Sequence, residues 1–148
     1  MFERIVAAID SDPERSTKVV AAAQELALKF HSTVLVAHVR EVERPAAMVA
    51  ATARPSALPP SVHVESEEDA AALVDGAVTR LRDAGIKANG QIGPGAGSTA
   101  RELLDIARAN GSTLIIVGDR DSRVSDVLLG GVAHKIAHLA DCPVLLVR

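Results

Sequence analysis

Short apolar runs alternate with amphipathic stretches along this chain. Four runs carry mostly hydrophobic side chains and are too short for helices: 5–9, 33–39, 113–117 and 144–147. Such runs are typical of strands that are buried on both faces of a parallel sheet. A weaker run at 86–92 is interrupted by Asn89 and Gly90, and it predicts a strand at the sheet edge, where weak propensity is tolerated.

The stretches between these runs place apolar residues at helical spacing and carry capping signals. They predict helices that start within 10–14 and within 66–69, and further helices over 98–110 and from 130 through 140. Gly85 and Gly111 are placed to end the second and third of these helices. Strands that alternate with helices predict an α/β fold, a doubly wound Rossmann-like sandwich with a mostly parallel sheet, in one domain over 1–148.

Residues 40–65 interrupt this rhythm. Four prolines lie there among alanines and two arginines, and the pattern predicts an irregular Pro/Ala-rich excursion with a short helix near 46–53. A long excursion in a compact domain is a lid, an interaction segment or a mobile loop, and the sequence leaves these three alternatives open.

The composition argues against two classes of function, nucleic-acid binding and membrane binding. Among 148 residues, 16 Lys and Arg stand against 19 Asp and Glu, and Phe2 and Phe30 are the two aromatic residues. A net charge of −3 and the scarcity of stacking rings argue against nucleic-acid binding. No apolar run reaches the roughly 18 residues of a membrane span, and the N-terminus lacks a signal-peptide pattern. We therefore expect a cytoplasmic protein with no membrane contact.

Ligands of doubly wound folds bind beyond the carboxyl ends of the strands. Asp10 follows the first strand, where its carboxylate is suited either to a ribose or metal ligand or to a helix cap. Gly118 ends an inner strand, where a glycine either lets a ligand approach the backbone closely or forms an ordinary tight turn. The Gly130–Gly131 pair opens a helix, whose free N–H groups favour an anion.

Other reactive residue types favour structural roles. His38 lies inside a buried strand and is predicted to be a hydrogen-bonded core or rim residue. His134 and His138 share a helix face at i, i+4 spacing, but the acid of a metalloprotease helix is missing. Cys142 is the one cysteine, and its neighbour Pro143 favours a packing role at the last strand. We therefore expect no metal site, apart from Mg²⁺ that accompanies a nucleotide.

The chain resembles the universal stress protein family over nearly its full length. The matching segments are IVAAID at 5–10, VLVAHV at 34–39, TLIIVG at 113–118, LLGGVA at 128–133 and ADCPVLLVR at 140–148. The resemblance implies a five-stranded parallel sheet of order 3-2-1-4-5 with helices on both faces. It also implies a homodimer through the C-terminal strand, 143–148, and this agrees with the need to cover an apolar edge strand.

ATP-binding members of that family carry a pattern of Gly, two residues, Gly, nine residues, Gly, then Ser or Thr. Gly118 fits the first glycine, but Asp121 stands at the second. With Gly130 as the third glycine, the spacing is one residue too short; with Gly131 as the third glycine, the spacing fits. The next residue is Gly131 in the first case and Val132 in the second, so neither alignment supplies the Ser or Thr. At ~4 Å and an effective dielectric near 20, Asp121 would repel a phosphate by about 4 kcal/mol before screening. Arg120 and Arg123 would offset part of this repulsion.

These departures predict a dimeric stress-response regulator or binding module with weak or absent ATP binding. The alternative is an adenine-nucleotide binding protein, for ATP, AMP or cyclic AMP, with at most slow hydrolysis; AMP or a cyclic nucleotide fits the departures better than ATP does. The sequence contains no recognisable set of catalytic residues. The positions predicted to contact an adenine nucleotide are Ala8, Ile9, Asp10, Val39, Val117, Gly118, Arg120, Gly130, Gly131 and Val132.

Overall fold

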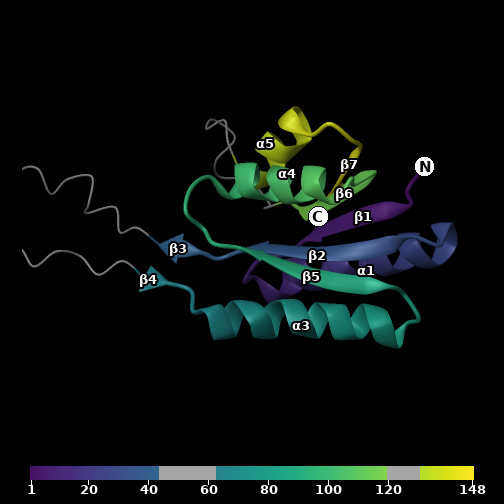
Figure 1. Ribbon diagram of the computed structural model, residues 1–148, viewed down its shortest axis with the longest axis horizontal. Coiled ribbons are helices and arrows are strands. Elements are labelled where there is room, and N and C mark those ends of the chain that lie inside the picture. Colours follow the sequence, from purple (N-terminus) through teal and green to yellow (C-terminus); the bar gives the residue numbers. More distant parts are fainter. Residues whose placement is uncertain (44–62, 120–130) are drawn as a thin grey trace, which may run out of the picture.

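The computed structural model describes residues 1–43, 63–119 and 131–148. Five parallel strands form one sheet in the order β5-β2-β1-β6-β7 (Figure 1). Their bounds are β1 Arg4–Ala8, β2 Thr33–Val39, β5 Ala88–Gly93, β6 Leu114–Gly118 and β7 Val144–Val147. Counted among themselves in chain order, these five strands run 3-2-1-4-5, which is the predicted α/β architecture.

In the described part of the chain, four helices cover the two faces of the sheet: α1 Pro13–Phe30, α3 Glu67–Asp83, α4 Thr99–Ala109 and α5 Val132–Leu139. Side chains of α1 and α3 join one core cluster with Ile5, Val36 and Ile116. Side chains of α4 and α5 join a second cluster on the opposite face, with Val6 and Val117. Successive strand residues thus alternate between two cores, which explains why the strands read as continuous apolar runs.

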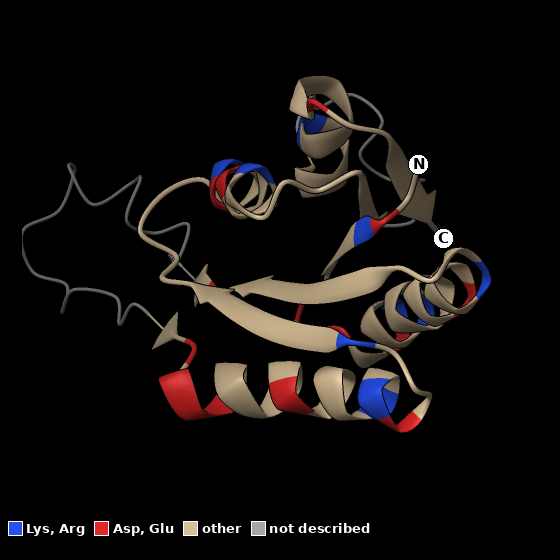
Figure 2. Ribbon diagram, turned by 45° about the vertical axis from the view of Figure 1, so that its right-hand side comes forward, with Lys and Arg blue, Asp and Glu red and all other residues tan. Residues whose placement is uncertain are grey.

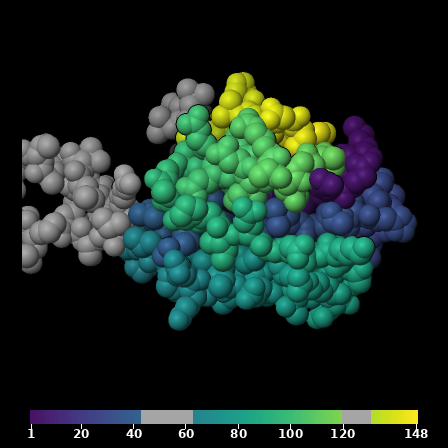
Figure 3. All heavy atoms as spheres, in the orientation of Figure 1, coloured from purple at the N-terminus to yellow at the C-terminus, as the bar shows by residue number. Residues whose placement is uncertain are grey.

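Lys, Arg, Asp and Glu residues lie mostly on the helices and connections, whereas the strands of the sheet contain few of them (Figure 2). In α3 three acidic residues, Glu67, Glu68 and Asp69, occupy the first turn, and Arg80 and Arg82 lie in the last turn, where the helix dipole favours them. In the space-filling view, α3 and α4 cover the lower and upper parts of one side of the molecule (Figure 3). The three inner strands, β2, β1 and β6, are therefore buried between two helical layers.

Local capping explains where the helices begin and end. Asp12, within the predicted range 10–14, caps α1 by accepting a hydrogen bond from the Arg15 amide, and Pro13 follows in the first turn. Ser66 and Ser98 cap α3 and α4 in the same way. Gly85 and Gly111 adopt φ of +84° and +62° at the ends of α3 and α4, as predicted from their positions.

The segment 40–65 is less irregular at its ends than the sequence predicted. β3, Val42–Glu43, pairs antiparallel with β4, His63–Val64, and the sequence analysis missed both strands. Two residues on each side give too short a pattern for a strand signal. The predicted helix near 46–53 lies outside the described residues.

The weak strand β5 lies at the sheet edge, as predicted, where it pairs with β2 alone among the described strands. Gly90 not only weakens this strand but also leaves room for α3 to pack against it. A Cβ at this position would lie 2.3 Å from Cγ1 of Val74 in α3. The glycine is therefore required for the close approach of α3 to the sheet.

Candidate functional site

The carboxyl ends of β1 and β6 lie side by side at the point where the winding of the sheet reverses. Ala8 pairs with Ala37 of β2 on one side and with Val117 of β6 on the other. From β1 the chain continues outward to β2 and β5, and from β6 it continues to β7 on the opposite side. In open α/β sheets, this switch point is where a ligand crevice forms. We call the β1–β6 end, with Asp10 and Gly118, the switch-point crevice.

The structure brings most of the predicted positions to this edge of the sheet. Ala8, Val39, Val117 and Gly118 are the last or next-to-last residues of β1, β2 and β6, and Ile9 and Asp10 follow β1 directly. Gly131 is the N-cap residue of α5, and Val132 begins the helix. Arg120 and Gly130 lie outside the described residues, as do Asp121 and Arg123.

Asp10 is tied to the first turns of α1. Its backbone amide and carbonyl oxygen both bond to the Ser16 hydroxyl, at 3.1 and 2.6 Å. Its Oδ1 accepts the Asp12 amide at 2.9 Å, and its Oδ2 accepts Nε of Arg15 at 2.7 Å. The helix cap is Asp12, so Asp10 instead holds the loop and an arginine in place.

Arg15 is a site residue that the sequence analysis missed. Its side chain crosses from α1 over Gly118, so that a Cβ on this glycine would lie 2.2 Å from Cγ of Arg15. Its guanidinium also lies 3.4 Å from Oδ2 of Asp12, and its side chain is 18% exposed. Nothing in the isolated helical stretch distinguishes Arg15 from the other cations of α1, Lys18 and Lys29, because the contact depends on the end of β6 reaching α1.

The charge around Arg15 is dominated by carboxylates. Burial opposes the charge on its guanidinium, but the hydrogen bond to Asp10 and the charges of Asp10, Asp12 and Glu41 outweigh this and raise the pKa of Arg15. Glu41 reaches the same loop by accepting the Ser11 amide at 3.2 Å and the Ser11 hydroxyl at 2.7 Å. Three carboxylates therefore lie around one guanidinium at the carboxyl end of β1.

A second charged group joins β6 to α5. Asp119, with a side chain 8% exposed, lies 3.5 Å from Nε of Arg148 and 3.9 Å from Nε2 of His134. The backbone amide of Asp119 also donates to the carbonyl oxygen of Val147. The start of α5 is thus held near the carboxyl end of β6, where the helix N-terminus favours an anion.

His38 is a hydrogen-bonded core residue, as predicted. Its side chain is 1% exposed, and its two ring nitrogens face the backbone oxygen of Ile9 and the carboxylate of Glu65. Glu65 also accepts the amide of Glu41 at 2.9 Å. Among the described residues, no three His, Cys, Asp or Glu side chains converge where they would hold a metal ion.

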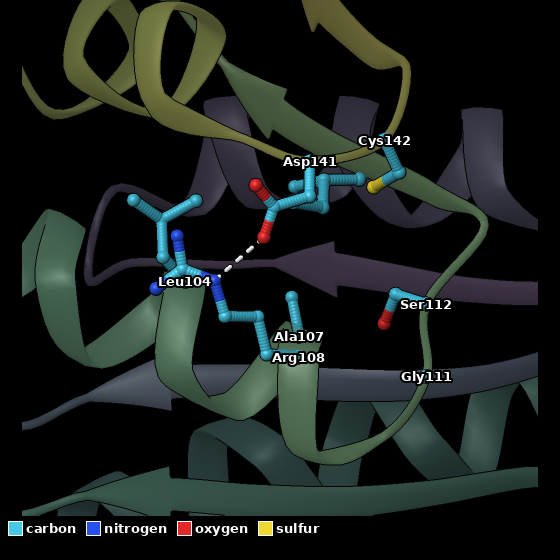
Figure 4. A pocket seen from close by; sticks show the side chains of 8 residues that line it. Leu104, Ala107, Arg108, Gly111, Ser112, Asp141 and Cys142 are labelled. Atoms are coloured by element: carbon cyan, nitrogen blue, oxygen red, sulfur yellow. Dashed lines mark hydrogen bonds and ion pairs between the residues drawn. The ribbon is translucent and has the colours of Figure 1, made fainter.

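A separate cavity of about 250 Å³ lies at the opposite, amino end of β6. Arg108 and Asp141 form an ion pair at 2.7 Å beside it, and Ser112 and Cys142 line it further along (Figure 4). Burial and then the negative charge of Asp141 raise the pKa of the Cys142 thiol. This thiol is therefore neutral at physiological pH, which agrees with a packing role.

Comparison with known proteins identifies the fold family. The profile of the universal stress protein family matches residues 1–148. The chain belongs to the universal stress protein family. Universal stress protein YxiE of Bacillus subtilis (strain 168) is 30% identical to it over 151 residues, and the alignment covers 100% of both chains.

Solved structures of this family have the same fold. The universal stress protein from Archaeoglobus fulgidus in complex with dAMP superimposes with a TM-score of 0.67 at 20% identity, and covers 100% of this chain and 98% of its own. A universal stress protein in complex with cAMP gives a TM-score of 0.68 at 19% identity, with 99% and 97% covered. None of the helices in the described ranges has the length and apolar character that a bilayer crossing requires.

Proposed function

We propose that this universal stress protein is a cytoplasmic binding module that takes an adenine nucleotide with few phosphates, AMP or a cyclic nucleotide, in the switch-point crevice. The proposal rests on one observation above all. Among the described residues at the carboxyl end of β1, the three carboxylates of Asp10, Asp12 and Glu41 lie around one guanidinium, that of Arg15. Each added phosphate charge meets this excess of negative charge, so a triphosphate binds less favourably than a monophosphate.

The sequence departures point in the same direction. Asp121 replaces the second glycine of the ATP pattern, and neither register of the third glycine is followed by a hydroxyl residue. Relatives of the same fold have been solved with dAMP and with cAMP, both of which carry one phosphate. These complexes support the ligand class proposed here for this chain.

The absence of Trp and Tyr makes the first experiment simple, since the protein itself absorbs little at 280 nm. The untagged protein is purified and its ultraviolet spectrum recorded; it is then denatured and any released nucleotide is identified by mass spectrometry. Calorimetric titrations with AMP, cyclic AMP and ATP follow, the last with and without Mg²⁺. GMP is the control for base recognition.

We expect AMP or cyclic AMP to bind at least tenfold more tightly than ATP, and GMP to bind more weakly than AMP. Stoichiometric ATP in the purified protein, or an ATP affinity equal to that of AMP, would contradict the proposal. Binding of GMP as tight as that of AMP would show that the crevice does not select adenine.

We further propose that the protein acts as a homodimer through residues 143–148. β7 is the last strand of the sheet and pairs with β6 alone within the described part of the chain. All four of its residues are apolar and at least partly exposed, with Leu145 at 38%. An apolar edge strand of this kind favours pairing with a second copy.

A further inference from the structure

We propose that Arg15 occupies the place in the switch-point crevice that the sugar of a nucleotide needs, so that a ligand binds by displacing this side chain. The inference rests on the proposed function in that it takes the crevice beside Gly118 as the ligand site. It adds a specificity-determining residue whose effect depends on the charge of the ligand.

The first argument is steric. Gly118 ends β6 with no side chain of its own, which leaves its backbone open to close approach. That space is already filled, because Cγ and Cδ of Arg15 lie 2.2 and 2.6 Å from the position of a Cβ on Gly118. Cγ2 of Val19, one helical turn further along α1, lies 3.5 Å from the same position. A ligand atom that approaches Gly118 from the side of its absent Cβ therefore collides with the aliphatic part of Arg15.

The second argument concerns hydrogen bonds. Both carboxylate oxygens of Asp10 are engaged, Oδ1 by the Asp12 amide and Oδ2 by Nε of Arg15. Ribose hydroxyl groups are donors that suit such a carboxylate. A hydroxyl that takes the position of Nε at Oδ2 restores the hydrogen bond of Asp10 and releases the guanidinium. The exchange leaves Asp10 satisfied in both states.

The third argument concerns charge. A guanidinium that leaves Asp10 and Asp12 needs another anion, and a nucleotide phosphate supplies one with matching geometry. Adenosine displaces Arg15 without offering this replacement. When AMP displaces Arg15 in the wild-type protein, its phosphate replaces the carboxylates that the guanidinium loses. Adenosine offers no such replacement, so we expect the wild-type protein to prefer AMP.

Arg15→Ala separates the two effects. Removing the side chain opens the space over Gly118, so adenosine should bind several-fold more tightly than to the wild type. AMP loses its cation in the same variant and is repelled by Asp10 and Asp12, so the ratio of AMP affinity to adenosine affinity should fall at least tenfold. The matched control is Lys18→Ala, which removes a cation of the same helix that pairs with Glu14 instead.

The experiment is equilibrium titration of both ligands into the wild-type and variant proteins, with circular dichroism to verify folding. If Arg15→Ala is folded and binds adenosine no better than the wild type, occlusion by Arg15 is wrong even where the wild type binds AMP as proposed. If the wild type binds neither ligand and Arg15→Ala binds adenosine, the occlusion stands and the proposed function of the wild type fails. Binding to neither protein contradicts both.

A measurement on the wild type does not depend on the variant's stability. The Nε–H of Arg15 donates to a carboxylate in the unliganded protein and should give a resolved signal in a nitrogen-correlated NMR spectrum, assigned by its loss in Arg15→Lys. Saturating AMP should shift this signal strongly. An unchanged signal at saturation would overturn the displacement.

Discussion

The imidazole of His38 lies between two acceptors, with Nδ1 2.9 Å from the backbone oxygen of Ile9 and Nε2 2.8 Å from Oε2 of Glu65. When Nδ1 donates to the carbonyl oxygen, the bond between Nε2 and Glu65 requires a second proton on the imidazole or the carboxyl group. Glu65 lies between β4 and the start of α3. The pair therefore fastens the end of the 40–65 segment to β2 beside the switch-point crevice.

The His38–Glu65 pair should contribute strongly to stability. His38→Leu leaves a Glu65 carboxylate that is 13% exposed without its main partner, and we expect a loss of about 3 kcal/mol in the free energy of unfolding. Glu65→Gln should cost only about 1 kcal/mol, because an amide N–H can donate to Nε2. Urea unfolding followed by circular dichroism measures both, with the exposed Glu68→Gln as control. Equal losses for His38→Leu and Glu65→Gln would contradict this account.

The sequence was sufficient for the features that depend on local pattern. Apolar runs identified four of the five sheet strands, and a weaker, interrupted run identified the fifth. Capping signals placed helix starts at 66–69 and 98, and the ends of the first and fourth strands pointed to Asp10 and Gly118. These signals are local because strand burial and capping involve residues a few positions apart.

Contacts between segments far apart in the chain could not be predicted from the sequence. Glu65 meets His38 across 27 positions, and Arg15 meets Gly118 across a still longer separation. Such contacts depend on which helix covers which strand end, and this is decided only when the sheet is assembled. Gly90 shows the same limit, since it weakens a strand in the sequence but admits Val74 in the structure.

The glycines of α3 and β5 should respond to alanine in opposite directions. Gly90→Ala places a methyl group 2.3 Å from Cγ1 of Val74 and should destabilise the protein by about 1–3 kcal/mol through overpacking. Gly76→Ala, in the middle of α3 with no atom within 4 Å of the new Cβ, should stabilise it by up to about 1 kcal/mol. Urea unfolding compares the two, and a stabilising Gly90→Ala would show that α3 can shift away from the sheet.

Cys142 should react slowly with thiol reagents. Burial and the charge of Asp141 raise the pKa of its thiol, so at a given pH its thiolate fraction is smaller than that of a free cysteine. Alkylation by iodoacetamide at pH 8 should therefore be several-fold slower than that of glutathione, and should accelerate as the pH rises. Asp141→Asn should speed the reaction modestly, because it removes the Coulombic part and leaves the burial. A reaction as fast as that of glutathione would contradict the assignment.

The proposed dimer through β7 predicts a specific effect of proline. The carbonyl oxygen of Pro143 accepts a hydrogen bond from Ile115 of β6, and that of Val147 accepts one from Asp119, which follows β6. By strand periodicity the backbone of Leu146 therefore faces the free edge. Leu146→Pro removes an N–H from that edge without removing a bond to β6. Sedimentation should give twice the 15.4 kDa chain mass for the wild type and for Leu146→Val, and the single mass for Leu146→Pro with its circular dichroism spectrum retained. A folded Leu146→Pro that still sediments as a dimer would place the interface elsewhere, and a monomeric wild type would refute it.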